Sequence, residues 1–223
     1  MMVHELSAHV QAIGILSLET AAKICADGFV REGLRLAADG TEPALLEDIL
    51  LTRTRALCQT YDNFLRMTIE GCAALSAGDG PGLVTHKLHA VYSIDFDREL
   101  LSTHGTVDKL RQRLRSAPVG AMDLDLFTET FGDLATIVRW RGPQVLTEIL
   151  DEFDDEFVRL GLRHVAAEGD IAALVEELES RMPAALKAVD NRCRLFTAGI
   201  TAIQQARSGA DLDAAMDATL ADC

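Results

Sequence analysis

The chain of 223 residues matches itself in a single register, the one that places residue 1 on residue 129. Residues 29–35 read FVREGLR and residues 157–163 read FVRLGLR, so six of these seven positions are identical. The same register gives 22 identities in 78 positions between 1–78 and 129–206, without a gap. Matched glycines, arginines, aspartates and asparagines do not arise from a bias toward alanine and leucine. We interpret the chain as an internal duplication; the alternative is two unrelated groups of amphipathic helices.

Each copy predicts three helices. The first covers 3–25, with a bend at Gly14, and is echoed by 124–153 around Gly142-Pro143. A short second helix is expected at 28–39 and at 156–168, and the stop signals are Gly40 and Gly169.

The third helix of each copy is long. The apolar spacing predicts it over 43–76, with Thr41 as the candidate cap, and over 170–206. Pro183 is expected to kink the second of these helices or to restart it near Ser180, because proline lacks a backbone N–H donor.

Composition favours an all-α fold. Alanine and leucine supply 62 of the 223 residues, whereas aromatic residues make up only 5%. We predict two tandem three-helix repeats with approximate twofold symmetry, whose long helices are antiparallel or crossing and share one core. Matched apolar positions should be buried in both copies: Phe29/Phe157, Leu34/Leu162, Leu46/Leu174 and Leu50/Leu178. The expected organisation is repeat 1 at 1–78, a joining helical segment at 79–128, repeat 2 at 129–206 and a C-terminal helix or tail at 207–223.

Charge and apolar patterning restrict the function classes. No run of about 18 consecutive apolar residues is present, and the N-terminus lacks a signal-peptide pattern, so we expect a cytoplasmic protein without integral membrane insertion. The net charge of −14 repels nucleic-acid phosphates and suits a basic protein partner. Five scattered cysteines give neither a disulfide framework nor a zinc motif, so we expect reduced thiols and no cofactor.

Three segments of the first copy resemble a known family: GILSLE at 14–19, DGFVREGLRLAADGTEP at 27–43 and LEDIL at 46–50. They are similar to the cytoplasmic helical region of the flagellar stator A subunit, in the MotA/TolQ/ExbB proton-channel family. The resemblance covers about 14–76 and, more weakly, 142–204.

The match departs from the family at the membrane. The long helices lead into Gly78-Asp79-Gly80-Pro81-Gly82 and Arg207-Ser208-Gly209, where the family continues into membrane spans, so no ion pathway is expected. The resemblance implies a soluble, non-catalytic protein–protein interaction module associated with motility, with a flagellar stator or rotor component as partner.

The first copy keeps the family-like turn DGTEP at 39–43, which marks it as the better candidate for an inherited contact surface. Exposed charges specify and steer protein partners. The predicted partner-binding residues flank that turn, although ordinary solvated charges remain the alternative: Arg31, Glu32, Arg35, Asp39, Glu42, Glu47 and Asp48.

Other clusters have simpler explanations. Asp62 with Arg66, and Asp190 with Arg194, have the spacing of i,i+4 ion pairs on a helix, as an alternative to a repeated binding site. The acidic run at 151–156 fits a helix start better than a cation site.

The joining segment supports an alternative function, a metal-dependent enzyme. It carries His86, His89 and His104 as weak metal-ligand candidates, together with Asp95 and Asp97. No recognised metal motif is matched. A third possibility is a regulator that mimics acidic nucleic acid through its charge.

Overall fold

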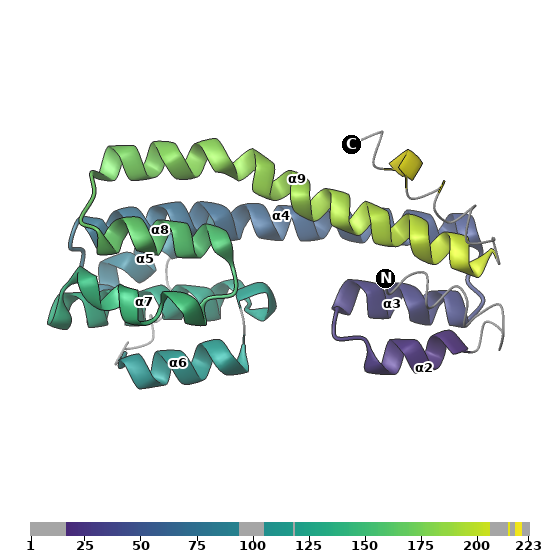
Figure 1. Ribbon diagram of the computed structural model, residues 1–223, viewed down its shortest axis with the longest axis horizontal. Helices are drawn as coiled ribbons and strands as arrows, with labels where there is room; N and C mark the ends of the chain where they lie inside the picture. Colours follow the sequence, from purple (N-terminus) through teal and green to yellow (C-terminus); the bar gives the residue numbers. More distant parts are fainter. Residues whose placement is uncertain (1–16, 94–104, 118, 206–213, 215–216, 220–223) are drawn as a thin grey trace. The chain divides into compact units, whose positions relative to one another are not determined.

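The computed structural model describes residues 17–93, 105–117, 119–205, 214 and 217–219, and contains helices and no strand over these residues (Figure 1). The predicted all-α class is therefore confirmed. The principal helices are α2 (Ser17–Ile24), α3 (Gly28–Ala38), α4 (Pro43–Ser76), α5 (Pro81–Tyr92), α6 (Val107–Ser116), α7 (Leu124–Arg141), α8 (Glu156–Ala166) and α9 (Ile171–Gln204). Short 3-10 helices are η1 (Val119–Ala121), η2 (Pro143–Glu148) and η3 (Leu150–Glu152).

The chain folds into two compact units whose limits differ from the predicted boundaries at 78 and 129. Unit 1 comprises Met1–Gln59 with Leu186–Cys223, and unit 2 comprises Thr60–Ala185. Both divisions fall inside a long helix, so α4 and α9 each contribute one half to each unit. Residues of both predicted repeats therefore build each unit.

Unit 1 has a core supplied by α2, α3, the first half of α4 and the last half of α9. Leu34 and Leu50 are buried with Ile200 and Ile203. The two halves of the long helices run in opposite directions beside α3 (Figure 1). Asp27 caps α3, because its side chain accepts hydrogen bonds from the backbone N–H groups of the first turn.

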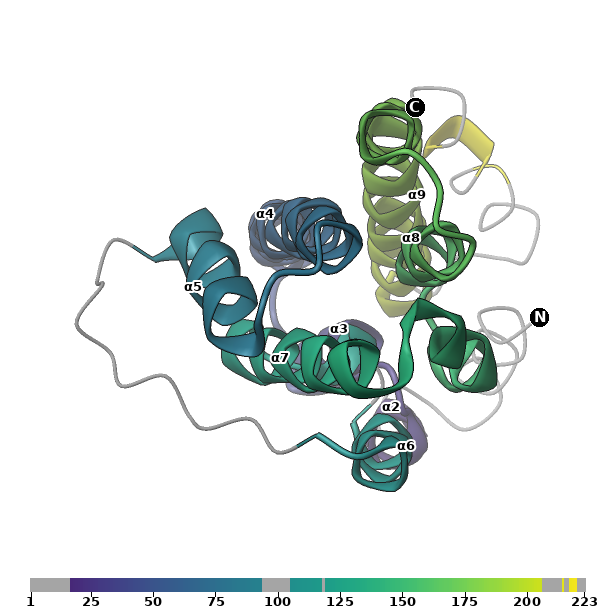
Figure 2. The same cartoon turned by 90° about the vertical axis from the view of Figure 1, so that its left-hand side faces the viewer.

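Unit 2 is centred on α7, of which half the residues are buried. Phe127 packs edge-on against Phe64 with ring centroids 5.0 Å apart, and Phe131 lies next to it at 5.1 Å. Helix α5 lies beside α7 in both views, and α6 packs on the same helix (Figures 1 and 2). An ion pair of 2.9 Å between Arg113 of α6 and the buried Asp133 of α7 fixes that second contact.

The two units contain the same close helix contact at matched positions of the two copies. A Cβ atom on Gly33 of α3 would lie 2.7 Å from Ile200 and 3.3 Å from Leu50. On Gly161 of α8, a Cβ atom would lie 2.6 Å from Cys72 and 3.4 Å from Leu178. A side chain at either position would force these neighbouring side chains to shift, so glycine permits the close approach of the helices. All eight matched apolar positions predicted to be buried are buried, which confirms that prediction.

The end of each short helix is also formed in the same way, but it corrects one predicted stop signal. Gly40 has φ of +76° after α3, whereas the residue with positive φ after α8 is Glu168, at 53°, and not Gly169. In both turns, the two N–H groups that follow the helix bond back to its last carbonyls.

The long helices correct two local expectations. Helix α9 continues through Pro183 from Ile171 to Gln204, so the predicted restart near Ser180 is wrong. Pro183 and Glu179 are both exposed, so water can satisfy the carbonyl group that the missing N–H leaves unpaired. Helix α4 begins at Pro43, which places Glu42, rather than Thr41, at the cap position.

Helices α5 and α6 lie within 79–128, the joining segment that was predicted to be helical. The predicted start of the first helix, its bend at Gly14 and most of the 207–223 tail lie outside the described residues.

Candidate functional site

The predicted partner-binding residues lie on α3, on the turn after it and at the start of α4. Arg35, Asp39, Glu42, Glu47 and Asp48 are exposed, whereas Arg31 and Glu32 are partly buried. Arg31 donates a hydrogen bond of 3.5 Å to the carbonyl of Cys25, and Arg159 donates the equivalent bond of 3.1 Å to Phe153 in unit 2. Arg31 therefore has a structural role that both units share.

The candidate metal ligands are not brought together within the described residues. His86 is exposed, whereas His89 is 13% exposed, contacts the ring of Tyr92 and lies 3.7 Å from the carboxylate of Asp125. No group of three or more metal-ligating side chains is found in the described part of the chain. Asp95, Asp97 and His104 lie outside it.

The repeated acid–arginine pairs and the acidic run have local structural roles. Asp62 with Arg66 and Asp190 with Arg194 each form an i,i+4 ion pair of 2.7 Å, and the hydrogen bond that Arg66 donates to the Asp62 carboxylate raises the pKa of Arg66. In the acidic run, the Asp155 side chain caps α8.

Free cysteines line the cores of both units. Cys72 and Cys193 are buried, whereas Cys25 and Cys58 are partly buried, and none of the four is in a disulfide. Burial raises the pKa of the Cys72 thiol well above its ordinary value. The thiol therefore stays protonated and is a packing residue rather than a nucleophile.

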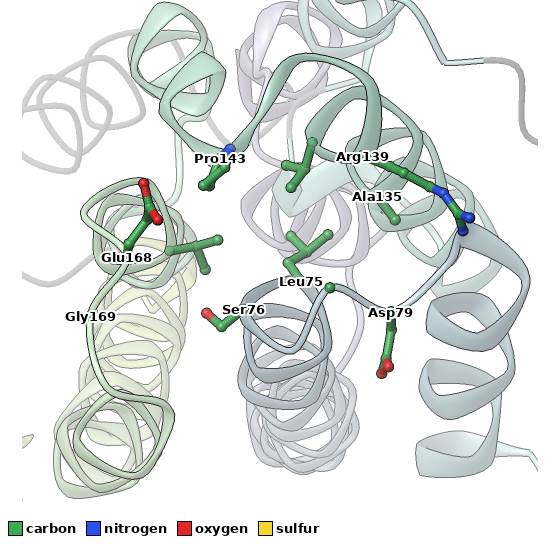
Figure 3. Close-up of a pocket in the computed structure, with 11 residues that line it drawn as sticks. Leu75, Ser76, Asp79, Ala135, Arg139, Pro143, Glu168 and Gly169 are labelled. Carbon is green, nitrogen blue, oxygen red and sulfur yellow. The ribbon is translucent and has the colours of Figure 1, made fainter.

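A cavity of about 480 Å³ lies at one end of unit 2 (Figure 3). The last turn of α4, the last turns of α7 and the turn after α8 meet there. Its apolar lining consists of Leu75, Ala135, Val138, Pro143 and Val165. Cavities of this volume with mainly apolar walls and a few polar groups are the usual form of small-molecule sites.

Three charged side chains surround this apolar lining, with Arg139 and Asp79 on one side and Glu168 on the other (Figure 3). Asp79 is ion-paired with Lys87 of α5 at 2.8 Å. Glu168 accepts a hydrogen bond from the amide of Gln144. Arg139 is exposed and has no ion-pair or hydrogen-bond partner among the described residues. The cavity therefore combines an apolar interior with one cation that remains available.

Two rim positions distinguish this end of unit 2 from the matched positions of unit 1. Glu168 has a positive φ, where the matching residue is Gly40. Ser76 points toward the segment that carries Gly169 (Figure 3), where the matching residue is the longer Gln204. In unit 1, the amide of Gln204 reaches the carbonyl of Thr41, which matches Gly169. The short Ser76 side chain leaves this space open in unit 2.

Unit 1 carries a second, more polar cavity of about 420 Å³ between α4 and α9. Glu47, one of the predicted partner-binding residues, contributes to its wall together with the ion pair of Asp190 and Arg194. Lys187 lies beside them. Because cations and carboxylates alternate along this wall, it has no single sign of charge that selects a ligand.

Sequence reasoning did not find the unit 2 cavity. Its apolar lining residues are ordinary core residues of helix ends and carry no motif. The sequence signal that was available is that two pairs of matched positions carry different residues. Ser76 matches Gln204, and Glu168 matches Gly40.

Comparison with known proteins gives no assignment: no family model, no curated protein and no solved structure matches the chain. Among the described residues, each helix is too short or too polar to span a bilayer. The function must therefore be inferred from the surfaces of the two units.

Proposed function

We propose that the chain is a duplicated helical module with approximate twofold symmetry between its copies. The support is the exchange of partners in the close helix contacts. Gly33 contacts Leu50 of its own copy and Ile200 of the other, and Gly161 contacts Leu178 of its own copy and Cys72 of the other. Each member of the first trio matches a member of the second in the register of the duplication, which is the pattern that a twofold axis between repeats produces.

We further propose that the module is non-catalytic and acts through protein–protein contact. The observation that carries this function is the acidic surface at the start of α4, formed by Glu42, Glu47 and Asp48. All three side chains are exposed, and none has an ion-pair partner among the described residues. Because the chain carries a net charge of −14, such a surface favours a basic partner.

The resemblance to the stator cytoplasmic region suggests a flagellar stator or rotor component as that partner. If so, immobilised protein should retain motor components from a lysate of the source cell, and deletion should alter swimming. Normal swimming of the deletion strain, with no retained motor component, would contradict the motility assignment while leaving protein–protein contact open to the next test.

Charge reversal tests the contact surface directly. Glu47→Lys with Asp48→Lys should weaken capture of the partner by at least tenfold and leave the thermal midpoint nearly unchanged, because both side chains are exposed. Glu176→Lys with Glu179→Lys is the matched control, since these residues are exposed on α9 in unit 2.

Asp170 and Glu177 are unsuitable for that control, because Asp170 caps α9 and Glu177 pairs with Arg181 at 2.9 Å. If the α9 reversal abolishes capture and the α4 reversal does not, the contact surface lies on unit 2. If neither reversal changes capture, the proposed electrostatic contact is wrong.

A further inference from the structure

We propose that the unit 2 cavity is a binding site for an aliphatic carboxylate, with the hydrocarbon part inside and the carboxylate on Arg139. The site lies wholly within unit 2 and is independent of the proposed protein contact. Three features support it: the chemistry of the interior, the state of the charges at the rim and the conformation of Glu168.

The interior fits an aliphatic group. Leu75, Val138 and Val165 approach it from α4, α7 and α8, and no charged group lies among them. Transfer of a hydrocarbon chain from water onto such walls is favourable in proportion to the apolar area removed from water. A cavity of about 480 Å³ lies within the usual volume range of ligand pockets.

The rim fits one negative charge. The Arg139 guanidinium lies next to Gly80, where an added Cβ atom would be 3.0 Å from Nη1. It is the only charged group at the rim with no partner among the described residues, since Asp79 pairs with Lys87 and Glu168 with Gln144. Guanidinium groups bind carboxylates through two parallel hydrogen bonds. The nearby Asp79 and Glu168 disfavour a multiply charged anion such as phosphate.

Glu168 provides the independent observation. A non-glycine residue with φ of 53° is strained, and glycine occupies the matching position of unit 1. Such strain is concentrated at ligand clamps and active sites. Here the strained residue holds one side of the cavity mouth through its hydrogen bond with Gln144.

Two kinds of molecule carry a carboxylate next to an aliphatic group: a free aliphatic acid, and a peptide whose C-terminal residue is aliphatic. Calorimetric titration of the full chain with decanoate tests the first source. Titration with a pentapeptide ending in leucine, with a free or an amidated C-terminus, tests the second. We expect saturable one-to-one binding with a Kd of about 1 mM or tighter for at least one carboxylate. The fluorescence of Trp140, the only tryptophan, provides a second signal because it follows Arg139 and is 83% exposed.

Two pairs of variants locate the site. Ser76→Gln should abolish binding, because it places in the cavity the longer side chain that unit 1 has at the matching position as Gln204, whereas Ser76→Ala should retain binding. Arg139→Gln should weaken binding about tenfold or more. Arg141→Gln removes the same charge from the same helix end and should change binding less than threefold, because Arg141 is paired with Glu148 at 2.8 Å.

Each variant is first checked for an unchanged helical spectrum and thermal midpoint. The proposal is overturned if neither carboxylate binds, if decanol binds as tightly as decanoate, or if Ser76→Gln binds like the wild type. Binding of decanoate alone assigns the site to a free acid. Binding of the free but not the amidated peptide assigns it to a chain terminus.

Discussion

Unit 1 and unit 2 share identical residues at the glycine contacts and at the starts of the short helices, and differ in the turns where the short helices end. Gly33 and Gly161 make the same close approach, and Asp27 and Asp155 cap the short helices that carry them. These positions are tightly constrained because protein interiors are packed without spare volume.

The difference lies at the far end of the short helices. Gly40 and Gln204 in unit 1 are replaced by Glu168 and Ser76 in unit 2, and the latter pair borders a cavity. A turn exposed to solvent tolerates substitution better than a helix contact does. Shared packing therefore identifies the fold, whereas the positions that differ identify the candidate site.

The largest expected effect comes from the matched leucines of the two cores. Leu50→Ala and Leu178→Ala should each lower the free energy of unfolding by about 2–5 kcal/mol, because each leaves a cavity beside a glycine contact. Urea denaturation followed by circular dichroism measures both. Costs that differ by more than about 2 kcal/mol would show that the two cores are not equivalent, despite their matched residues.

A somewhat smaller loss in the free energy of unfolding is expected from a substitution that acts on unit 2 alone. Arg113→Ala should cost about 3 kcal/mol, because it removes the guanidinium that neutralises the buried Asp133 carboxylate. The control is Arg115→Ala on the same helix, whose ion pair with Glu152 is exposed and screened by water, so its loss should change the free energy of unfolding far less.

Hydrogen exchange of α6 amides measures where this effect acts. We expect faster exchange in α6 of the Arg113→Ala variant, with the amides of α3 in unit 1 unchanged. Equal costs for the two arginine variants would show that the Arg113–Asp133 pair does not hold α6 on α7.

Much of the fold could be predicted from the sequence, because helix formation and burial depend on local spacing. The apolar period predicts α4 within one residue of its observed end, and the matched leucines are buried as expected. The continuation of α9 through Pro183 was not predictable, because it depends on whether the carbonyl of Glu179 faces solvent. The cavity was not predictable either, since it requires the ends of three helices to meet and Ser76 to be too short to fill the space between them.

Removal of either helix cap should lower the free energy of unfolding by about 1–2 kcal/mol. Asp27→Ala removes an acceptor for the N–H groups of Phe29 and Val30, at 2.9 and 3.1 Å. Asp155→Ala removes the cap of α8 and also the acceptor for the Tyr61 hydroxyl at 3.0 Å. We therefore expect the greater loss in unit 2.

Thermal and urea denaturation of both alanine variants tests this order. Tyr61→Phe separates the two roles of Asp155, because it removes the hydroxyl and leaves the cap. If Asp27→Ala costs more than Asp155→Ala, the Tyr61 contact does not contribute to stability.

The smallest expected change in the free energy of unfolding comes from exchanging the residues that differ at the turns after the short helices. Glu168→Gly should raise the free energy of unfolding by about 0.5–1 kcal/mol, because glycine adopts a positive φ without the strain that a side chain adds. The lost hydrogen bond to Gln144 is exposed and offsets only part of this gain. Gly40→Glu should lower stability by a similar amount, and the double exchange should be nearly neutral because the sites lie in different units. Thermal denaturation should show shifts of about 1–4 °C in opposite directions. A lower midpoint for Glu168→Gly would mean that the Glu168–Gln144 hydrogen bond outweighs the backbone strain. The Glu168 side chain would then stabilise the turn after α8.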